Sequence, residues 1–123
     1  MTRRARGGTF AHDANRTLGR SGISVGEVGL GTWGISGEGY GPSLELTSRA
    51  TLRAAIDAGG SFIETADCYR EGEMLEWIGD LKRDVGADKV FASVRVGVNR
   101  DPVQPVPRKD FSARTSPRPA SGR

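Results

Sequence analysis

Apolar side chains change their spacing in a regular order through the middle of the chain. Residues 28–34 and 61–66 each hold a short apolar run bounded by glycine, which is typical of a buried strand of a parallel sheet. Residues 46–58 and 74–85 repeat apolar side chains near the spacing of a helix. Residues 89–97 form a third strand-like run. This order of strand, helix, strand, helix and strand predicts parallel β/α units.

Capping residues mark the ends of the two predicted helices. Ser43 and Thr47 are both candidate N-caps of the first helix, and Gly59 is a natural stop. The second helix ends before Gly86. The first helix has its apolar positions at Leu46, Ala50, Leu52, Ala54, Ala55 and Ile56. The second has an apolar face of Met74, Leu75, Ile78 and Leu81.

The segments on either side of these units differ from them in pattern. Residues 16–25 alternate around Gly19 and Gly22, which predicts a small β-hairpin. Residues 1–15 have no periodicity and are expected to be a disordered leader. Residues 98–123 mix proline and arginine with small residues and are expected to be a disordered tail. The folded part is therefore expected to span residues 16–97.

Composition bounds the size of the core and the compartment. The chain of 123 residues corresponds to about one domain, and its 36% hydrophobic and 7% aromatic content gives a modest core. The single cysteine, Cys68, excludes an internal disulfide and is typical of a reducing compartment. No run is apolar and long enough to span a membrane or to act as a secretory signal. We therefore expect a soluble cytoplasmic protein.

Charge is unevenly distributed, although the formal net charge is only +3. Residues 1–20 and 98–123 each carry a net charge of +4, whereas residues 21–97 carry −5. Basic ends can contact nucleic acid or anionic lipid, but these ends lack interleaved aromatic residues and a recognisable binding module. Solvated ends are therefore favoured over a nucleic-acid-binding surface.

Polar and reactive side chains gather where the second predicted strand ends. This end carries Glu64, Asp67, Cys68 and Tyr69. In parallel α/β folds the carboxyl ends of strands open into the loops that shape the active site. Each residue also has an ordinary structural interpretation: a strand-end tyrosine, a turn or helix-start carboxylate at Asp67, and a small packed side chain at Cys68. No residues lie at metal-ligand spacing, so no metal is expected.

Several motifs in the correct succession resemble the opening third of an aldo/keto reductase. They are Arg16-Thr17-Leu18-Gly19, Gly29-Leu30-Gly31-Thr32-Trp33, Phe62-Ile63-Glu64-Thr65-Ala66-Asp67-Cys68-Tyr69, the spacing of Gly72 and Gly79, and Val94-Arg95-Val96-Gly97. The resemblance covers about residues 16–97. It implies an α/β fold, a partial parallel β/α barrel of the TIM type with about three β/α units after an N-terminal β-hairpin. It also implies NADP-dependent reduction of a small-molecule carbonyl compound by hydride transfer.

The resemblance also assigns roles to individual residues. Tyr69 corresponds to the family's catalytic tyrosine, which gives its proton to the carbonyl oxygen, and Glu64 and Arg95 stand at the positions of the catalytic aspartate and lysine. A free phenol has a pKa near 10, so it needs a nearby cation and a polar pair to act as an acid at neutral pH. The residues that correspond to the family's cofactor-binding positions are Gly31, Thr32, Trp33 and Glu64. The implied cofactor is NADPH.

The chain departs from the family's pattern near the site. Glu64 and Arg95 keep the charges of the usual pair and change their geometry, because arginine presents a planar fork where lysine presents a compact ammonium. A structural ion pair is an equally good interpretation of these two residues. Gly60 replaces a large aliphatic residue, and Arg70 stands where the family favours glycine. The only histidine, His12, lies in the leader, whereas the family's histidine follows a fourth strand.

The length of the chain leaves two functional hypotheses open. A complete barrel needs about 200 residues, and the pattern predicts only three strands here. In the family the cofactor's phosphates are held by segments after strands seven and eight. We therefore expect a truncated reductase with little or no activity alone, and the alternative is a non-enzymatic binding or interaction module. Open edges of a three-stranded sheet also predict self-association.

Overall fold

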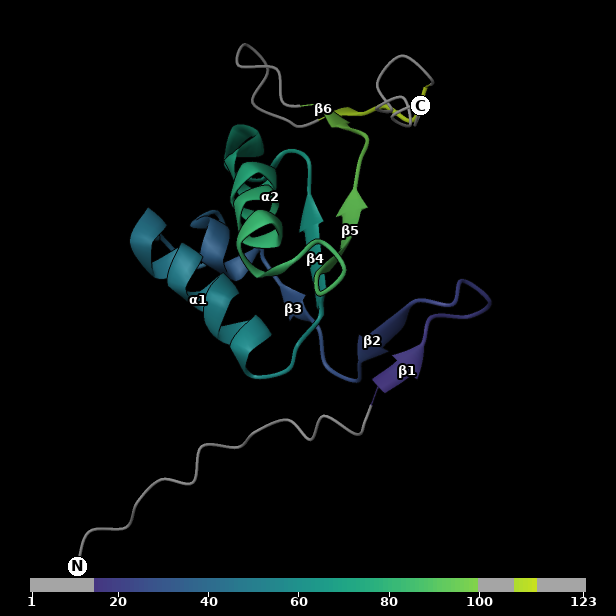
Figure 1. The fold of residues 1–123 in the computed structure, drawn as a ribbon. Coiled ribbons are helices and arrows are strands. Elements are labelled where there is room, and N and C mark those ends of the chain that lie inside the picture. The colour runs from purple at the N-terminus through teal and green to yellow at the C-terminus, as the bar shows by residue number, and fades with distance from the viewer. Residues whose placement is uncertain (1–14, 100–107, 113–123) are drawn as a thin grey trace, which may run out of the picture.

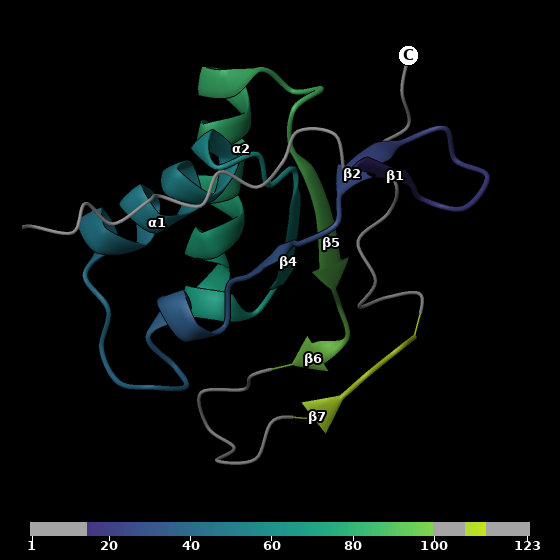
Figure 2. The same cartoon turned by 90° about the horizontal axis from the view of Figure 1, so that it is seen from below.

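The computed structural model describes residues 15–99 and 108–112, and its centre is a parallel sheet with two helices packed beside it (Figure 1). The sheet has the strand order β3-β4-β5. In chain order the central elements are β3 (Leu30–Gly31), η1 (Gly34–Ser36), α1 (Glu45–Asp57), β4 (Phe62–Ala66), η2 (Tyr69–Gly72), α2 (Glu73–Val85) and β5 (Phe91–Arg95). Both helices lie on the same side of the sheet (Figure 2). The predicted parallel β/α units are confirmed.

Backbone pairing fixes which strand ends lie together. In the parallel register Gly31 of β3 lies beside Glu64 of β4, and Ala66 of β4 lies beside Arg95 of β5. Parallel strands present their carboxyl ends at one edge of the sheet. The ends of all three strands, with the 3₁₀ helices that follow β3 and β4, therefore form one surface.

The predicted hairpin precedes the sheet. Strands β1 (Asn15–Thr17) and β2 (Ser24–Gly26) pair antiparallel, with Arg16 opposite Val25. An ion pair of 2.7 Å between Arg16 and Glu27 joins the first strand to the segment after the second. The hairpin is confirmed and begins at Asn15, one residue before its predicted start. Residues 1–14, which were expected to be disordered, lie outside the described residues.

The apolar core lies between the sheet and the two helices. The alternating side chains of β4 bury Ile63 and Thr65, and α2 contributes an apolar face to the same core. The buried cluster consists of Leu52, Ile63, Ala66, Tyr69, Met74, Trp77, Ile78, Leu81 and Val90. Neither of the helices described is long and apolar enough to cross a membrane.

The first helix differs from its prediction at its N-terminus. Leu44 is the N-cap, and its side chain makes no capping hydrogen bond. Neither Ser43 nor Thr47 therefore caps the helix. The Ser43 hydroxyl instead lies 2.7 Å from that of Ser48, which is fully buried. Leu46, which was predicted as an apolar position of this helix, is 81% exposed and does not belong to the core.

The first strand of the sheet, β3, is more exposed than its sequence predicts, and the third strand, β5, is also largely exposed. β3 is only two residues long, and Val28 and Trp33 at either side of it are exposed. β5 has four exposed positions out of its five residues. Within the described residues no further strand pairs with the outer edge of either strand. An apolar run is buried only where neighbours cover it, so these runs remain open to solvent.

A short antiparallel pair follows the sheet. Strands β6 (Val98–Asn99) and β7 (Arg108–Lys109) pair with each other, and the backbone N–H of Asp110 donates to the oxygen of Gly97 at 2.8 Å. The expectation of a disordered tail from residue 98 onward therefore does not hold for these strands. Gly97 has a φ of 97°, which lets the chain turn back for this pairing. The rest of the expected tail lies outside the described residues.

Candidate active site

The residues at the carboxyl ends of β4 and β5 come from the same face of the sheet. Side chains alternate along a strand, so Glu64 points away from the core side chains Ile63 and Thr65. Arg95 lies two positions beyond Ser93, the direct neighbour of Glu64, and so occupies the diagonal position on that face. Long side chains reach across such a diagonal. Tyr69 follows in η2, after the turn that leaves β4.

Arg95 connects the two other predicted catalytic residues. Its Nε lies 2.5 Å from Oε1 of Glu64, and its Nη2 donates a hydrogen bond to the hydroxyl of Tyr69. Its guanidinium carbon also lies 5.7 Å from the centre of the Tyr69 ring. The structure thus brings Glu64, Tyr69 and Arg95 together, as the sequence led us to expect. Their catalytic roles stay predictions.

The environment of Tyr69 raises the pKa of its phenol. Burial is the main cause, because the side chain is only 6% exposed and the charged phenolate would lose its water. The positive charge of Arg95 acts in the opposite direction and lowers the pKa, while the negative charge of Glu64 raises it. The phenol is therefore protonated at neutral pH and can donate its proton, but it holds that proton more firmly than a free phenol.

The three predicted cofactor-binding residues of the first strand have different surroundings. A Cβ built on Gly31 would lie 3.7 Å from Oε2 of Glu64 and would meet nothing else within 4 Å, so the space above Gly31 is open. Thr32 is fully buried, and its hydroxyl donates to that of Thr65 at 2.9 Å. Trp33 is 44% exposed, and its ring meets that of Tyr40 edge-on at 5.3 Å. Gly31 and Trp33 are thus accessible to a ligand, whereas Thr32 holds two strands together.

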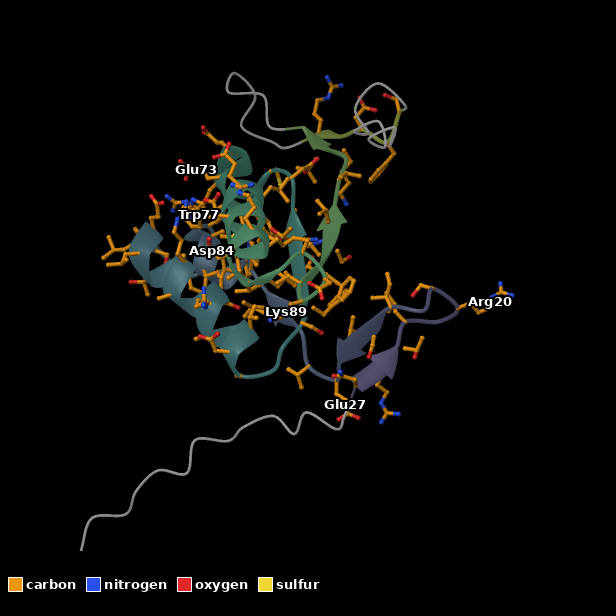
Figure 3. The ribbon with its side chains drawn as sticks, in the orientation of Figure 1. Arg20, Glu27, Glu73, Trp77, Asp84 and Lys89 are labelled. Atoms are coloured by element: carbon orange, nitrogen blue, oxygen red, sulfur yellow. The ribbon has the colours of Figure 1, made fainter. Side chains whose placement is uncertain are left out.

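Arg70 lies near the site, at a position where the sequence pattern of the family favours glycine. Its φ of 50° is left-handed, a conformation that favours glycine. Its backbone N–H donates to a carboxylate oxygen of Glu38 at 2.8 Å, and its Nε donates to Glu73 at 2.9 Å. Its guanidinium lies 4.8 Å from the ring centre of Trp77, which lies on the side of α2 that faces α1 (Figure 3). The mismatch between arginine and an expected glycine was the signal for this backbone conformation.

Asp67 and Cys68 lie in the turn between β4 and η2. The backbone N–H of Asp67 donates to the oxygen of Arg95 at 3.1 Å, so this turn also holds the end of β5. Cys68 is half-buried and packs against the core, which agrees with its interpretation as a packed side chain. Among residues 15–99 and 108–112 no group of three or more metal-ligating side chains exists.

Three parallel strands with two helices on one side form part of a β/α barrel, and comparison with known proteins identifies the family. The family model of the aldo/keto reductases matches residues 27–117, so the chain belongs to the aldo/keto reductase family. The fold is accordingly an incomplete parallel β/α barrel of the TIM type.

Individual relatives agree with this assignment. Aldo-keto reductase YhdN of Bacillus subtilis is 36% identical over 80 residues, which are 64% of this chain and 24% of that protein. A probable voltage-gated potassium channel subunit beta of Oryza sativa is 35% identical over 72 residues, 58% of this chain and 21% of that protein. Among solved structures, the inferred aldo-keto reductase PA4992 of Pseudomonas aeruginosa aligns with a TM-score of 0.65 and 31% identity, covering 85% of this chain and 38% of that one. The chain thus spans about a quarter of the length of these two sequence relatives.

Proposed function

We propose that the chain is an NADP-dependent oxidoreductase of the aldo/keto reductase type by descent, with little or no activity alone. The observation that supports this proposal is the position of Arg95, which contacts both Glu64 and Tyr69 at the mouth of the partial barrel. The substrate class is a small-molecule carbonyl compound, and the proposed location is the cytoplasm.

The chemistry follows from the hydrogen bonds at Tyr69. When NADPH is bound, it supplies the hydride that reduces the carbonyl carbon. Arg95 donates to the Tyr69 oxygen, so the phenolic proton remains free to point at a carbonyl oxygen and to be transferred to it. Glu64 holds the guanidinium in place. A misplacement of about 1 Å in a catalytic group can cost roughly a hundredfold in rate, so the fork of Arg95 is a poor replacement for a lysine.

The described residues fit one end of the cofactor. The open space above Gly31 lies beside the Glu64 carboxylate and provides room for a nicotinamide ring. Trp33, two positions after Gly31, has an exposed ring that offers an aromatic surface. A carboxylate beside the ring can accept a hydrogen bond from the amide of the nicotinamide. We assign these residues to the nicotinamide end of NADPH and assign none to its phosphates.

A titration of NADPH fluorescence tests the proposal. We expect saturable, micromolar binding by the unchanged chain and none by Gly31→Leu, because the new side chain would fill the space above Glu64. Gly79→Leu is the matched control, since a Cβ at Gly79 of α2 meets only the flexible end of Arg83, at 3.7 Å. Equal binding by Gly31→Leu would place the cofactor elsewhere, and no fluorescence change with the unchanged chain would refute cofactor binding.

A non-enzymatic binding module is the second candidate function. The raised pKa of Tyr69 favours it, because an acid that holds its proton firmly is a weak catalyst. The relative from Oryza sativa is named as a probable potassium channel subunit, which is a role in an assembly and not a reaction. Absence of NADPH binding by a chain that is folded by circular dichroism would support this candidate over the reductase.

We also propose that the outer edge of β5 causes self-association. Phe91 donates its N–H to the oxygen of Ser61 in the β4 segment, so in the alternating pattern of a strand the N–H of Val94 points to the open edge. An open edge is a template for another chain. We expect Val94→Pro to shift the sedimentation coefficient to that of a monomer, because proline removes the donor, and Val94→Thr to leave association unchanged. An equal effect of both variants, or a monomeric unchanged chain, would exclude this edge.

A further inference from the structure

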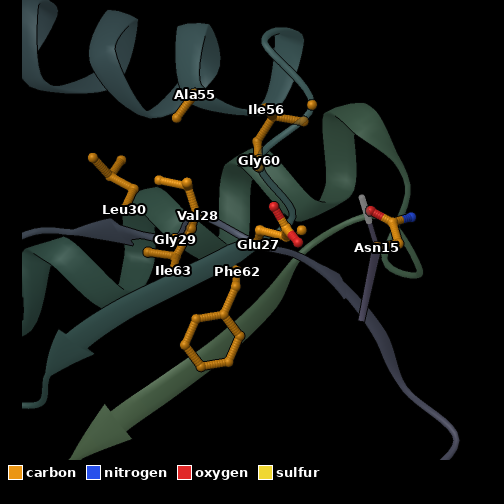
Figure 4. Close-up of a pocket in the computed structure, with 12 residues that line it drawn as sticks. Asn15, Glu27, Val28, Gly29, Leu30, Ala55, Ile56, Gly60, Phe62 and Ile63 are labelled. Carbon is orange, nitrogen blue, oxygen red and sulfur yellow. The ribbon is translucent and has the colours of Figure 1, made fainter. Parts of the chain in front are cut away.

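A cavity of about 300 Å³ lies at the opposite end of β4 from Tyr69 (Figure 4). Residues of the hairpin, α1 and the beginning of β4 line it, and the cavity is open to solvent on one side. Its walls include Asn15, Glu27, Val28, Leu30, Ala55 and Phe62. The residues Glu64, Tyr69 and Arg95 do not line it, so this cavity is separate from the candidate active site.

Backbone segments approach one another closely at two glycines of the cavity wall. A Cβ on Gly29 would stand 3.0 Å from both the side chain and the backbone oxygen of Phe62. A Cβ on Gly60 would stand 2.8 Å from the backbone oxygen of Ala55. Glycine is required where the chain passes this closely, because any side chain would collide with the neighbouring segment. The path of the backbone therefore sets the shape of the cavity.

The walls of the cavity are apolar on one side and polar on the other. Figure 4 shows Leu30, Val28 and Ala55 together at one side, with the carboxylate of Glu27 and the amide of Asn15 towards the other. Binding sites for small molecules have this composition, a mostly apolar wall with a few polar groups that fix orientation. An apolar cavity of about 150 Å³ is already large enough to bind benzene.

We propose that this cavity binds a small aromatic molecule that carries one hydrogen-bond donor, of about the size of indole. The aromatic body would pack against the apolar wall, and the donor would meet the Glu27 carboxylate. Glu27 accepts hydrogen bonds from Arg16 at 2.7 and 3.0 Å, both at Oε1, and its side chain is 44% exposed. A carboxylate has about four lone-pair positions on two oxygens, so Oε2 can accept a further donor.

Ligand titrations followed by two-dimensional amide NMR test this proposal, with indole as the probe. We expect saturable binding with a dissociation constant on the order of 1 mM, since so small a ligand makes few contacts. Ala55→Leu should weaken binding at least about tenfold, because its side chain points into the cavity and the larger one would fill it (Figure 4). Ala54→Leu is the matched control, because Ala54 is exposed on the same helix, and its affinity should equal that of the unchanged chain.

Further arms of the experiment separate the parts of the proposal. Indene has the shape of indole without the N–H, and we expect it to bind several-fold more weakly. Should Ala55→Leu fail to fold, Val28→Phe narrows the cavity from a side chain that is 55% exposed, and loss of indole binding is expected again. The proposal would be overturned if Ala55→Leu or Val28→Phe bound indole as tightly as the unchanged chain does. It would also be overturned if indole binding to the unchanged chain did not saturate. Equal affinity for indene and indole would overturn the role of the hydrogen-bond donor. A changed sedimentation coefficient of Ala55→Leu with unchanged indole affinity would assign the cavity to contacts between copies of the chain.

Discussion

The substitution Ile63→Ala is expected to lower the free energy of unfolding by about 3 kcal/mol. Ile63 is fully buried in β4, the middle strand of the sheet, where it belongs to the core cluster between sheet and helices. Removing buried methyl groups costs both their transfer energy and the cavity that remains. The chain has only 123 residues, and small domains bury a small fraction of their surface. A loss of this size therefore takes most of the stability of the chain.

Urea unfolding followed by far-ultraviolet circular dichroism measures the effect. The matched control is Val94→Ala, a β-branched residue in the neighbouring strand β5 that is 39% exposed. Its substitution is expected to cost less than about 1 kcal/mol. Similar midpoints for both variants would show that Ile63 packs no more tightly than an edge residue, which would contradict a core centred on β4.

Elements with a strong local pattern could be predicted from the sequence, and elements that depend on neighbours could not. The spacing of Met74, Ile78 and Leu81 predicted α2 and its buried face. Glycine patterns at Gly19 and Gly22 predicted the hairpin, and both have a positive φ in the structure. The burial of the first strand of the sheet, β3, was predicted wrongly, because an apolar run does not reveal whether another strand will lie beside it.

The meeting of Glu64, Tyr69 and Arg95 was expected from the family resemblance, and strand order with side-chain alternation explains the proximity of two of them. Glu64 and Arg95 lie on the same face of adjacent strands, which fixes their proximity without knowledge of the loops. The full conformation of the loop after β4 could not be predicted, because the family's glycine signals a positive φ at Arg70 but nothing signals one at Glu71. Arg70 and Glu71 both adopt a positive φ, and no sequence rule expects two such residues in succession without glycine. Contacts made by Arg70 with Glu38 and Trp77 accompany this costly conformation.

Opposite shifts in the pKa of Tyr69 are expected when its two charged neighbours are neutralised one at a time. Arg95 lowers this pKa and Glu64 raises it, so Arg95→Met should raise the pKa further and Glu64→Gln should lower it. The chain has two tyrosines, and Tyr40→Phe leaves Tyr69 as the only one that titrates. Ultraviolet absorbance of the tyrosinate, recorded against pH in this background, measures the shift. The chains compared are Tyr40→Phe alone, Tyr40→Phe with Arg95→Met, and Tyr40→Phe with Glu64→Gln. Shifts of the Tyr69 pKa in the same direction, or an ordinary pKa in every chain, would show that the side chains of Glu64, Tyr69 and Arg95 do not interact.

The raised pKa also predicts how stability depends on pH. A phenol whose pKa is higher in the folded chain than in the unfolded chain favours folding fully below the unfolded value of about 10. Above that pH the unfolded chain releases its proton first, and the contribution is lost as the pH rises through the folded pKa of Tyr69. Urea midpoints should therefore fall above about pH 10 in the Tyr40→Phe chain and fall less when Tyr69 is also replaced by phenylalanine. Because burial is the largest cause of the shift, an equal fall in both chains would mean that water reaches the Tyr69 hydroxyl and that burial does not raise its pKa.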